Sequence, residues 1–126
     1  MQKQSPKVLV VDDSATMRMF LSMTLKRVFE DISITEAENG VDAIKKLQTQ
    51  DVDIVLTDMM MPEMNGLQLI ENIRRLLNKD VPIIVITTKG EEKDRELGLS
   101  LGANGYITKP VSGHKLKDEV LKFLGC

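Results

Sequence analysis

Five short apolar runs alternate along the chain with longer segments whose apolar residues recur every three or four positions. The runs have the length and β-branched content of buried strands, whereas the longer spacing is typical of amphipathic helices. The run 83–87, which follows Pro82, is the most apolar, while 33–37 alternates in polarity and predicts an edge strand. The five predicted strands are 7–11, 33–37, 54–57, 83–87 and 105–108.

The segments between these runs predict five helices, each with one apolar face. Ser14 is a candidate N-cap for the first helix, and Asn39-Gly40 and Asn65-Gly66 lead into the second and third. The fourth helix, 90–101, contains Gly98, which weakens a helix by about 1 kcal/mol relative to alanine. The expected inward positions are Met17, Phe20, Leu21, Leu25, Val28, Val41, Ile44, Leu47, Leu67, Ile70, Ile73, Leu77, Leu116, Val120, Phe123 and Leu124.

Regular alternation of strand and helix predicts an α/β fold with a parallel sheet covered on both faces. Right-handed crossovers leave few topologies, and we expect a doubly wound, five-stranded sheet in the flavodoxin-like order 2-1-3-4-5 with five helices. In that order the first and third strands are neighbours. Ligands of such sheets bind at the carboxyl ends of the strands, beside this switch point.

Polar residues with chemical potential stand at the carboxyl ends of four predicted strands. Asp12 and Asp13 follow the first strand, Asp58 follows the third, Thr87 ends the fourth, and Lys109 follows the fifth. The predicted strand order brings all five to one edge of the sheet. Two carboxylates about 5 Å apart repel by about 3 kcal/mol at an effective dielectric constant of 20, so we expect a cation among them.

A hard, all-oxygen ligand set of this kind suits Mg²⁺, which prefers to share a phosphoryl oxygen. Asp58 would then be free to attack phosphorus and form an aspartyl phosphate. Lys109 and the Thr87 hydroxyl would neutralise and orient the phosphoryl oxygens.

Each residue also has an ordinary structural interpretation when it is taken alone. Asp58 can be a turn former, and Asp12-Asp13 can cap the first helix. Lys109 can be a solvated lysine at a strand end, Thr87 a β-branched strand residue, and Tyr106 a core residue. It is their joint position at one edge that favours the chemical interpretation.

Composition limits the classes of partner. The 126 residues are 42% hydrophobic and 29% charged, which predicts one globular domain over 1–126. A net charge of −2 and few aromatic residues argue against nucleic-acid binding, and no apolar run approaches the ~20 residues of a membrane span. The single cysteine, Cys126, cannot form an internal disulfide, and a reduced cytoplasmic location is expected.

Four motifs in the order and spacing of one family extend over nearly the whole chain. They are V-L-V-V-D-D-S (8–14), L-T-D-M-M-M-P-E-M-N-G (56–66), V-I-T-T (85–88) and G-Y-I-T-K-P (105–110). The chain resembles a response-regulator receiver domain of two-component signalling, of the single-domain chemotaxis type, without an output domain. The resemblance implies a signalling phosphoacceptor, not an enzyme, that acts as a monomer.

The resemblance also implies roles for individual residues. Asp58 would be the phosphoacceptor, Asp12, Asp13, Asp58 and the Met60 carbonyl would hold Mg²⁺, and Thr87 and Lys109 would bind the phosphoryl group. The Lys109–Pro110 bond would be cis. Phosphorylation would draw the Thr87 hydroxyl inward and let Tyr106 rotate, which would remodel the face made by the fourth helix, the last strand and the last helix.

Two positions depart from fast-hydrolysing chemotaxis regulators. Met60 stands where some of them carry an amide that can orient water, and Thr88 stands where a small residue is frequent. Both differences predict a phosphorylated state that lasts longer than in the fast chemotaxis regulators.

Other functional classes fit less well. A phosphatase of the haloacid-dehalogenase type needs a second aspartate at the position of Met60. A flavodoxin-like FMN binder needs a first loop that accepts phosphate, which Asp12-Asp13 would repel. A degenerate receiver used only for docking would not need the full set of acceptor-site residues.

The expected phosphodonor is a sensor histidine kinase. The segment D-D-S-A-T-M-R (12–18) and Gly105-Tyr106 favour chemotaxis, with the flagellar motor switch as the partner of the remodelled face. The alternative is a stand-alone receiver that relays phosphate or regulates a target other than the motor.

Overall fold

A computed structural model describes residues 5–61, 63–88 and 90–124; Cys126 lies outside these ranges. Within these residues the fold is a five-stranded sheet with five α-helices and one π-helical segment, η1. The strands are β1 (Lys7–Val11), β2 (Ser33–Ala37), β3 (Ile54–Thr57), β4 (Ile83–Thr87) and β5 (Gly105–Thr108). The helices are α1 (Ala15–Val28), α2 (Gly40–Thr49), α3 (Gly66–Glu71), η1 (Asn72–Leu76), α4 (Glu92–Leu101) and α5 (Gly113–Leu124).

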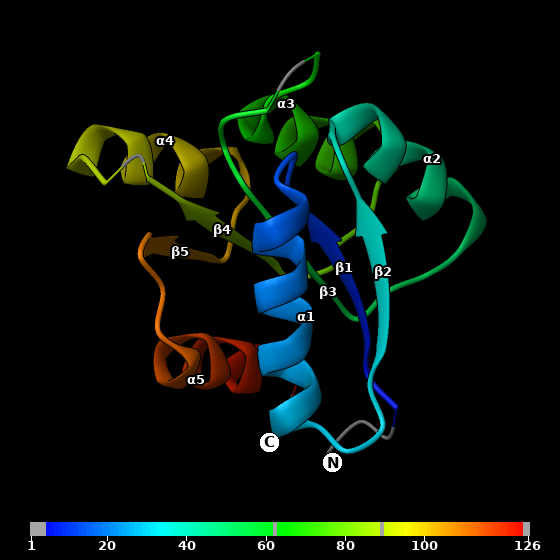
Figure 1. Cartoon of the computed structure of the whole chain (residues 1–126). Helices are drawn as coiled ribbons and strands as arrows, with labels where there is room; N and C mark the ends of the chain where they lie inside the picture. Colours follow the sequence, from blue (N-terminus) through cyan, green and yellow to red (C-terminus); the bar gives the residue numbers. More distant parts are fainter. Residues whose placement is uncertain (1–4, 62, 89, 125–126) are drawn as a thin grey trace.

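The sheet confirms the predicted topology. All neighbouring strands are parallel and their order is β2-β1-β3-β4-β5 (Figure 1). In the register between β1 and β3, Val11 lies opposite Thr57. The next residues of the two strands, Asp12 and Asp58, therefore leave the sheet side by side.

Apolar side chains alternate between the two faces of the sheet and form two cores. Leu9 and Val55 belong to the core beneath α2, α3 and η1, and Val10 and Leu56 belong to the core beneath α1 and α5. Figure 1 shows α1 and α5 covering the same face of the sheet. Because both faces are covered, β3 and β4 are buried along their whole lengths, which explains their continuous apolar sequence.

Helix starts follow the capping signals of the sequence. The Ser14 side chain accepts a hydrogen bond from the Met17 amide, which confirms Ser14 as the N-cap of α1. Asn65 and Gln68 form a reciprocal capping box at the start of α3. Gly66 is required there because a Cβ atom would lie 2.4 Å from the Asp58 carbonyl oxygen. This close approach packs the start of α3 directly against the end of β3.

Three details differ from the predicted helices. The predicted inward position of Phe20 is wrong: the residue is 40% exposed, because α1 buries only a narrow stripe that contains Leu21 and Leu25. The third helix changes to π-helical geometry after Glu71, and the Leu77 amide donates to the Asn72 carbonyl, five residues back. The fourth helix begins at Glu92 and not at residue 90.

Among the described residues, none of the helices has both the length and the apolar character that crossing a bilayer requires.

Candidate functional site

Three carboxylates meet at the carboxyl ends of β1 and β3. One oxygen each of Asp12, Asp13 and Asp58 lies within 4.8 Å of the others. Asp12 and Asp58 are buried, with 1% and 7% of their surfaces exposed, whereas Asp13 faces solvent. The strand register places them, since the Asp12 amide donates to Ala37 of β2 and the Asp58 amide donates to Val11 of β1. The predicted convergence of the three acidic residues is confirmed.

Lys109 reaches this cluster from the end of β5. Its ammonium lies 3.1 Å from Asp12 Oδ2 and 3.2 Å from Asp58 Oδ2, and its side chain is 14% exposed. The Lys109 amide also donates to the Thr87 carbonyl, which joins the ends of β4 and β5. The peptide bond between Lys109 and Pro110 is cis, as the resemblance implied. The lysine thus bridges two buried carboxylates that belong to different strands.

The two oxygens of Asp58 have different surroundings. Oδ1 accepts hydrogen bonds from the backbone amides of Met59, at 2.6 Å, and Met60, at 3.2 Å. Oδ2 accepts from the Lys109 ammonium. The loop backbone therefore fixes the carboxylate plane and directs Oδ2 toward the cation.

Burial and neighbouring charge act on both members of the Asp12–Lys109 pair. Burial raises the pKa of Asp12 above its usual value, although the Ser14 amide and Lys109 oppose this effect. Burial alone would lower the pKa of Lys109, but the hydrogen bond and charge of Asp12 and the charge of Asp58 outweigh it and raise the pKa. Lys109 therefore stays protonated at neutral pH.

Thr87 and Tyr106 belong to β4 and β5, next to the acidic cluster. Thr87 is fully buried at the last position of β4 and pairs with Thr108. Tyr106 is half-buried, and its hydroxyl donates to Met59 Sδ at 3.9 Å, a long contact to the residue that follows Asp58. Burial raises the pKa of Tyr106, and the charges of Asp94 and Asp58 add to this. Asp12, Asp13, Asp58, Thr87 and Lys109 therefore lie at or just beyond the carboxyl ends of their strands, whereas Tyr106 is the second residue of β5 and Met60 lies in the loop after β3.

The donor set fits a hard divalent cation. Three carboxylates and one ammonium leave the cluster with two excess negative charges, and every candidate ligand atom is an oxygen. Carboxylate oxygens suit Mg²⁺, Mn²⁺ or Ca²⁺ and not softer metals. Asp12, Asp13 and Asp58 are the residues that can hold such an ion.

Arg18 is a site residue that was not among those predicted from the sequence. This arginine donates to the Asp12 carbonyl through one nitrogen and to the Glu36 carboxylate, at 2.9 Å, through another. It thereby fixes the backbone of the acidic loop to the edge strand β2. A basic residue in the second turn of the helix that follows an acidic pair is the sequence signal that indicates it.

Comparison with known proteins identifies the class. A family model of the response regulator receiver domain matches residues 8–121. The chain therefore belongs to the receiver-domain family, and it is a signalling phosphoacceptor and not a catalytic enzyme. Membership in this family implies a histidine kinase as phosphodonor.

Its relatives include proteins named for chemotaxis. The chain is 44% identical to chemotaxis protein CheY1 of Helicobacter pylori over 122 residues, which cover 94% of this chain and 97% of that protein. It is 43% identical to a CheY homolog of Campylobacter jejuni over 121 residues, which cover 94% and 92% of the two chains. The solved structure of CheY4 of Vibrio cholerae superposes with a TM-score of 0.86 at 30% identity, over 96% of this chain and 100% of that one.

Proposed function

We propose that Asp58 of this receiver accepts a phosphoryl group from the phosphohistidine of a sensor kinase. The observation that carries this proposal is the position of the Lys109 ammonium, within 3.2 Å of both Asp12 and Asp58 at the edge where the three carboxylates meet. A buried acceptor beside a fixed cation is the arrangement that phosphoryl transfer needs, because that reaction depends mainly on positioning and charge neutralisation.

The proposed transfer assigns a task to each oxygen of Asp58. Oδ1 is held by two backbone amides, so Oδ2 is the oxygen that attacks phosphorus. A bond forms between Oδ2 and phosphorus while the bond between phosphorus and the donor imidazole nitrogen breaks, and that nitrogen keeps the electron pair. Lys109 then exchanges its contact with the carboxylate for one with a phosphoryl oxygen, and the Thr87 hydroxyl donates to another.

Mg²⁺ is the proposed cofactor, held by Asp12, Asp13, Asp58 and the backbone carbonyl of Met60. When bound, this ion would neutralise charge on the phosphoryl oxygens. Asp12 and Asp13 have a second task in the proposal, since their charges keep the site selective for a cation before the donor arrives.

The same proposal includes a conformational switch. Movement of Thr87 toward the phosphoryl group opens space on the inner side of Tyr106, and rotation of the tyrosine ring changes the surface made by α4, β5 and α5. The phosphoryl group can shift this equilibrium only as far as it binds the switched arrangement more tightly than the resting one.

For the downstream step we propose chemotaxis, with the flagellar motor switch as the partner of this surface. Support comes from the relatives that are named as chemotaxis proteins and that match over nearly their whole length. Such a role would place the protein in the cytoplasm as a single-domain monomer. The alternative is a receiver that relays phosphate or regulates another target.

The proposed acceptor is tested by incubating the protein with radiolabelled acetyl phosphate and Mg²⁺. We expect acid-stable, base-labile labelling of the wild type, none in Asp58→Asn, and full labelling in the control Asp51→Asn, an exposed aspartate that pairs with Lys79 away from the site. Labelling that survives in Asp58→Asn would assign the acceptor elsewhere. Capture of the purified motor switch protein with and without beryllium trifluoride then separates the chemotaxis role from the alternative.

A further inference from the structure

Arg74 of η1 makes five hydrogen bonds at the end of the sheet opposite the phosphoacceptor site. Nε and Nη2 donate to the Gly102 carbonyl at 3.1 and 2.7 Å, and Nη2 also donates to Asn104 Oδ1 at 2.9 Å. Nη1 donates to the carbonyls of Lys79 and Val81, both at 2.8 Å. One guanidinium therefore joins the loop after α4 to the loop before β4.

The loop after α4 is shaped around this arginine. Gly102 ends the helix with φ of 121°, and a Cβ atom there would lie 2.9 Å from Arg74 side-chain atoms. Asn104 continues the connection, because its side-chain Oδ1 accepts a hydrogen bond from the backbone amide of Ile83 and its backbone amide donates to the Ile83 carbonyl. The C-terminal end of α4 is thus fixed to the beginning of β4.

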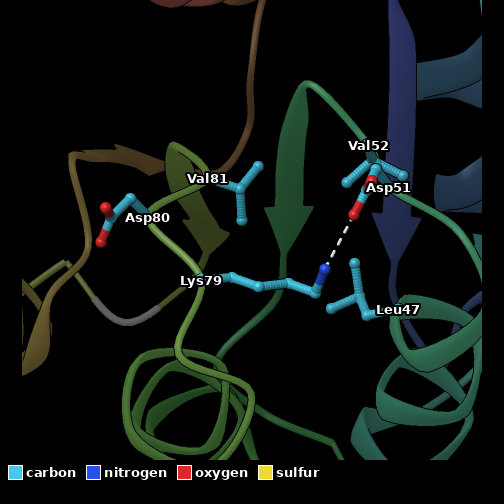
Figure 2. Close-up of a pocket in the computed structure, with 6 residues that line it drawn as sticks. All are labelled: Leu47, Asp51, Val52, Lys79, Asp80 and Val81. Atoms are coloured by element: carbon cyan, nitrogen blue, oxygen red, sulfur yellow. Dashed lines mark hydrogen bonds and ion pairs between the residues drawn. The ribbon is translucent and has the colours of Figure 1, made fainter.

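The loop before β4 has a weaker second attachment. Lys79, Asp80 and Val81 are among the residues that line a cavity of about 250 Å³. Figure 2 shows the Lys79 ammonium directed at Asp51. This ion pair measures 2.8 Å, but the Asp51 side chain is 92% exposed, and exposed pairs contribute little to stability. Arg74 joins this loop, through the carbonyls of Lys79 and Val81, to Gly102 at the end of α4.

The remainder of α4 is held loosely. Of its ten residues only Gly98 is buried, and the N-cap residue Glu91 makes no side-chain capping bond. Gly98 lies against the ring of Tyr106, since a Cβ atom there would be 3.6 Å from two ring carbons. One end of α4 is fixed by hydrogen bonds, whereas its middle rests on the residue that is proposed to rotate.

We infer that Arg74 is a positioning residue that makes the C-terminal end of α4 a fixed pivot. Rotation of Tyr106 then turns the N-terminal half of α4 while Gly102 and Asn104 stay in place. This inference rests on the proposed function, because it describes how the switch at Tyr106 reaches the surface. A guanidinium is needed for it, since its planar fork serves four acceptors at once and the single ammonium of a lysine cannot.

The test is hydrogen exchange of single amides, measured by NMR with and without Mg²⁺ and beryllium trifluoride. In the wild type we expect the ligand to change exchange in the first half of α4 and to leave the amides of Gly102, Ala103 and Asn104 unchanged. In Arg74→Met these three amides should exchange about ten-fold faster or more, because several hydrogen bonds to a charged group are lost. In Arg74→Lys the three amides should exchange as fast as in Arg74→Met. This variant keeps the positive charge but lacks the planar guanidinium, so it separates the effect of geometry from that of charge.

Arg75→Met is the matched control. Arg75 is the next residue, its side chain is 81% exposed, and it pairs with Glu71 at 3.9 Å, so its loss should leave exchange in the loop unchanged. The inference would be overturned if the three loop amides exchanged equally slowly in the wild type and in Arg74→Met. It would also be overturned if the ligand changed exchange in the wild type as much at Asn104 as at Glu92. If Arg74→Met does not fold, the wild-type pattern alone decides.

The two hypotheses fail separately. Acetyl-phosphate labelling of Arg74→Met should equal that of the wild type, because Arg74 binds the loops at the opposite end of the sheet from Asp58. Absence of labelling in the wild type refutes the proposed function, whereas normal labelling with an unchanged loop in Arg74→Met refutes the pivot.

Discussion

Replacing Asp58 by asparagine should stabilise the unphosphorylated protein, although the substitution removes one member of a buried ion pair. The asparagine side chain would be nearly isosteric, and its oxygen can still accept from the amides of Met59 and Met60. What changes is the charge. The substitution deletes one attraction, to Lys109, and two repulsions, from Asp12 and Asp13.

The size of the effect follows from the distances. At an effective dielectric constant of 20, the attraction across 3.2 Å is about 5 kcal/mol. The repulsion from Asp12, whose oxygen lies within 4.8 Å, is about 3.5 kcal/mol or more, and the repulsion from Asp13 is smaller because solvent screens this exposed side chain. The two together exceed the attraction by up to about 2 kcal/mol. Weaker hydrogen bonds to a neutral acceptor reduce this gain, and we expect a net stabilisation of about 1 kcal/mol.

Urea denaturation in the absence of divalent ions measures this difference as a higher midpoint with an unchanged slope. Mg²⁺ should then reduce the difference in stability between the wild type and Asp58→Asn. An ion at ten times its dissociation constant stabilises the wild type by about 1.4 kcal/mol, and it should stabilise Asp58→Asn less because one ligand has lost its charge. Asp51→Asn is the control and should leave the midpoint unchanged. A lower midpoint for Asp58→Asn without Mg²⁺ would refute the view that repulsion dominates the resting site.

Four further predictions concern neighbouring residues. Lys109→Met should destabilise the protein by about 3 kcal/mol, because it leaves two buried carboxylates without their cation. Mg²⁺ should restore part of the lost stability, and urea denaturation with and without the ion measures both effects. Gly66→Ala should lower the free energy of unfolding by about 3 kcal/mol or more in the same assay, since its Cβ would lie 2.4 Å from a backbone oxygen. Gly98→Ala meets only ordinary contacts and should raise the free energy of unfolding by up to about 1 kcal/mol. The Tyr106 hydroxyl should ionise above pH 10, and because the tyrosine of the unfolded chain ionises first, stability should fall as pH rises beyond about 10. The phenolate absorbance reports this titration unambiguously, since the chain has one tyrosine and no tryptophan, and Asp94→Asn should lower the pH at which half of the tyrosine is ionised. Loss of phosphate from the purified phosphoprotein should take much longer than a few seconds and should be faster in Met60→Asn, and a wild-type half-life of a few seconds would contradict this expectation.

The fold could be predicted because its strands carry local signals. β-branched runs bounded by Pro82 or by the acidic pair after Val11 are strands in any context where both faces are covered. The acidic cluster followed from the strand order alone, since the order places the ends of β1 and β3 together. No distance had to be known for that step.

The missed features depend on tertiary contacts that leave no periodic pattern. Phe20 is apolar and lies at helical spacing from the buried residues of α1. It is nevertheless exposed, because only a narrow stripe of α1 is buried between the sheet and α5. Arg18 and Arg74 bind backbone carbonyls of residues in other elements, and every residue type offers a carbonyl. The π-helical turn of η1 likewise has no composition signal, and it contains the arginine that holds two loops.

In the proposed switch, the two cations that tie β5 to the rest of the molecule determine how a small change at the site reaches a distant surface. Arg74 holds Asn104, directly before the strand, and Lys109, directly after it, binds Asp12 and Asp58. Tyr106 therefore stands on a strand that is fixed at both ends and paired with β4 along its length. Such a strand cannot shift without breaking these contacts. In the proposed switch, the strain of a new group at Asp58 would therefore be relieved by rotation of the Tyr106 side chain and by movement of α4, which buries only Gly98 against that side chain.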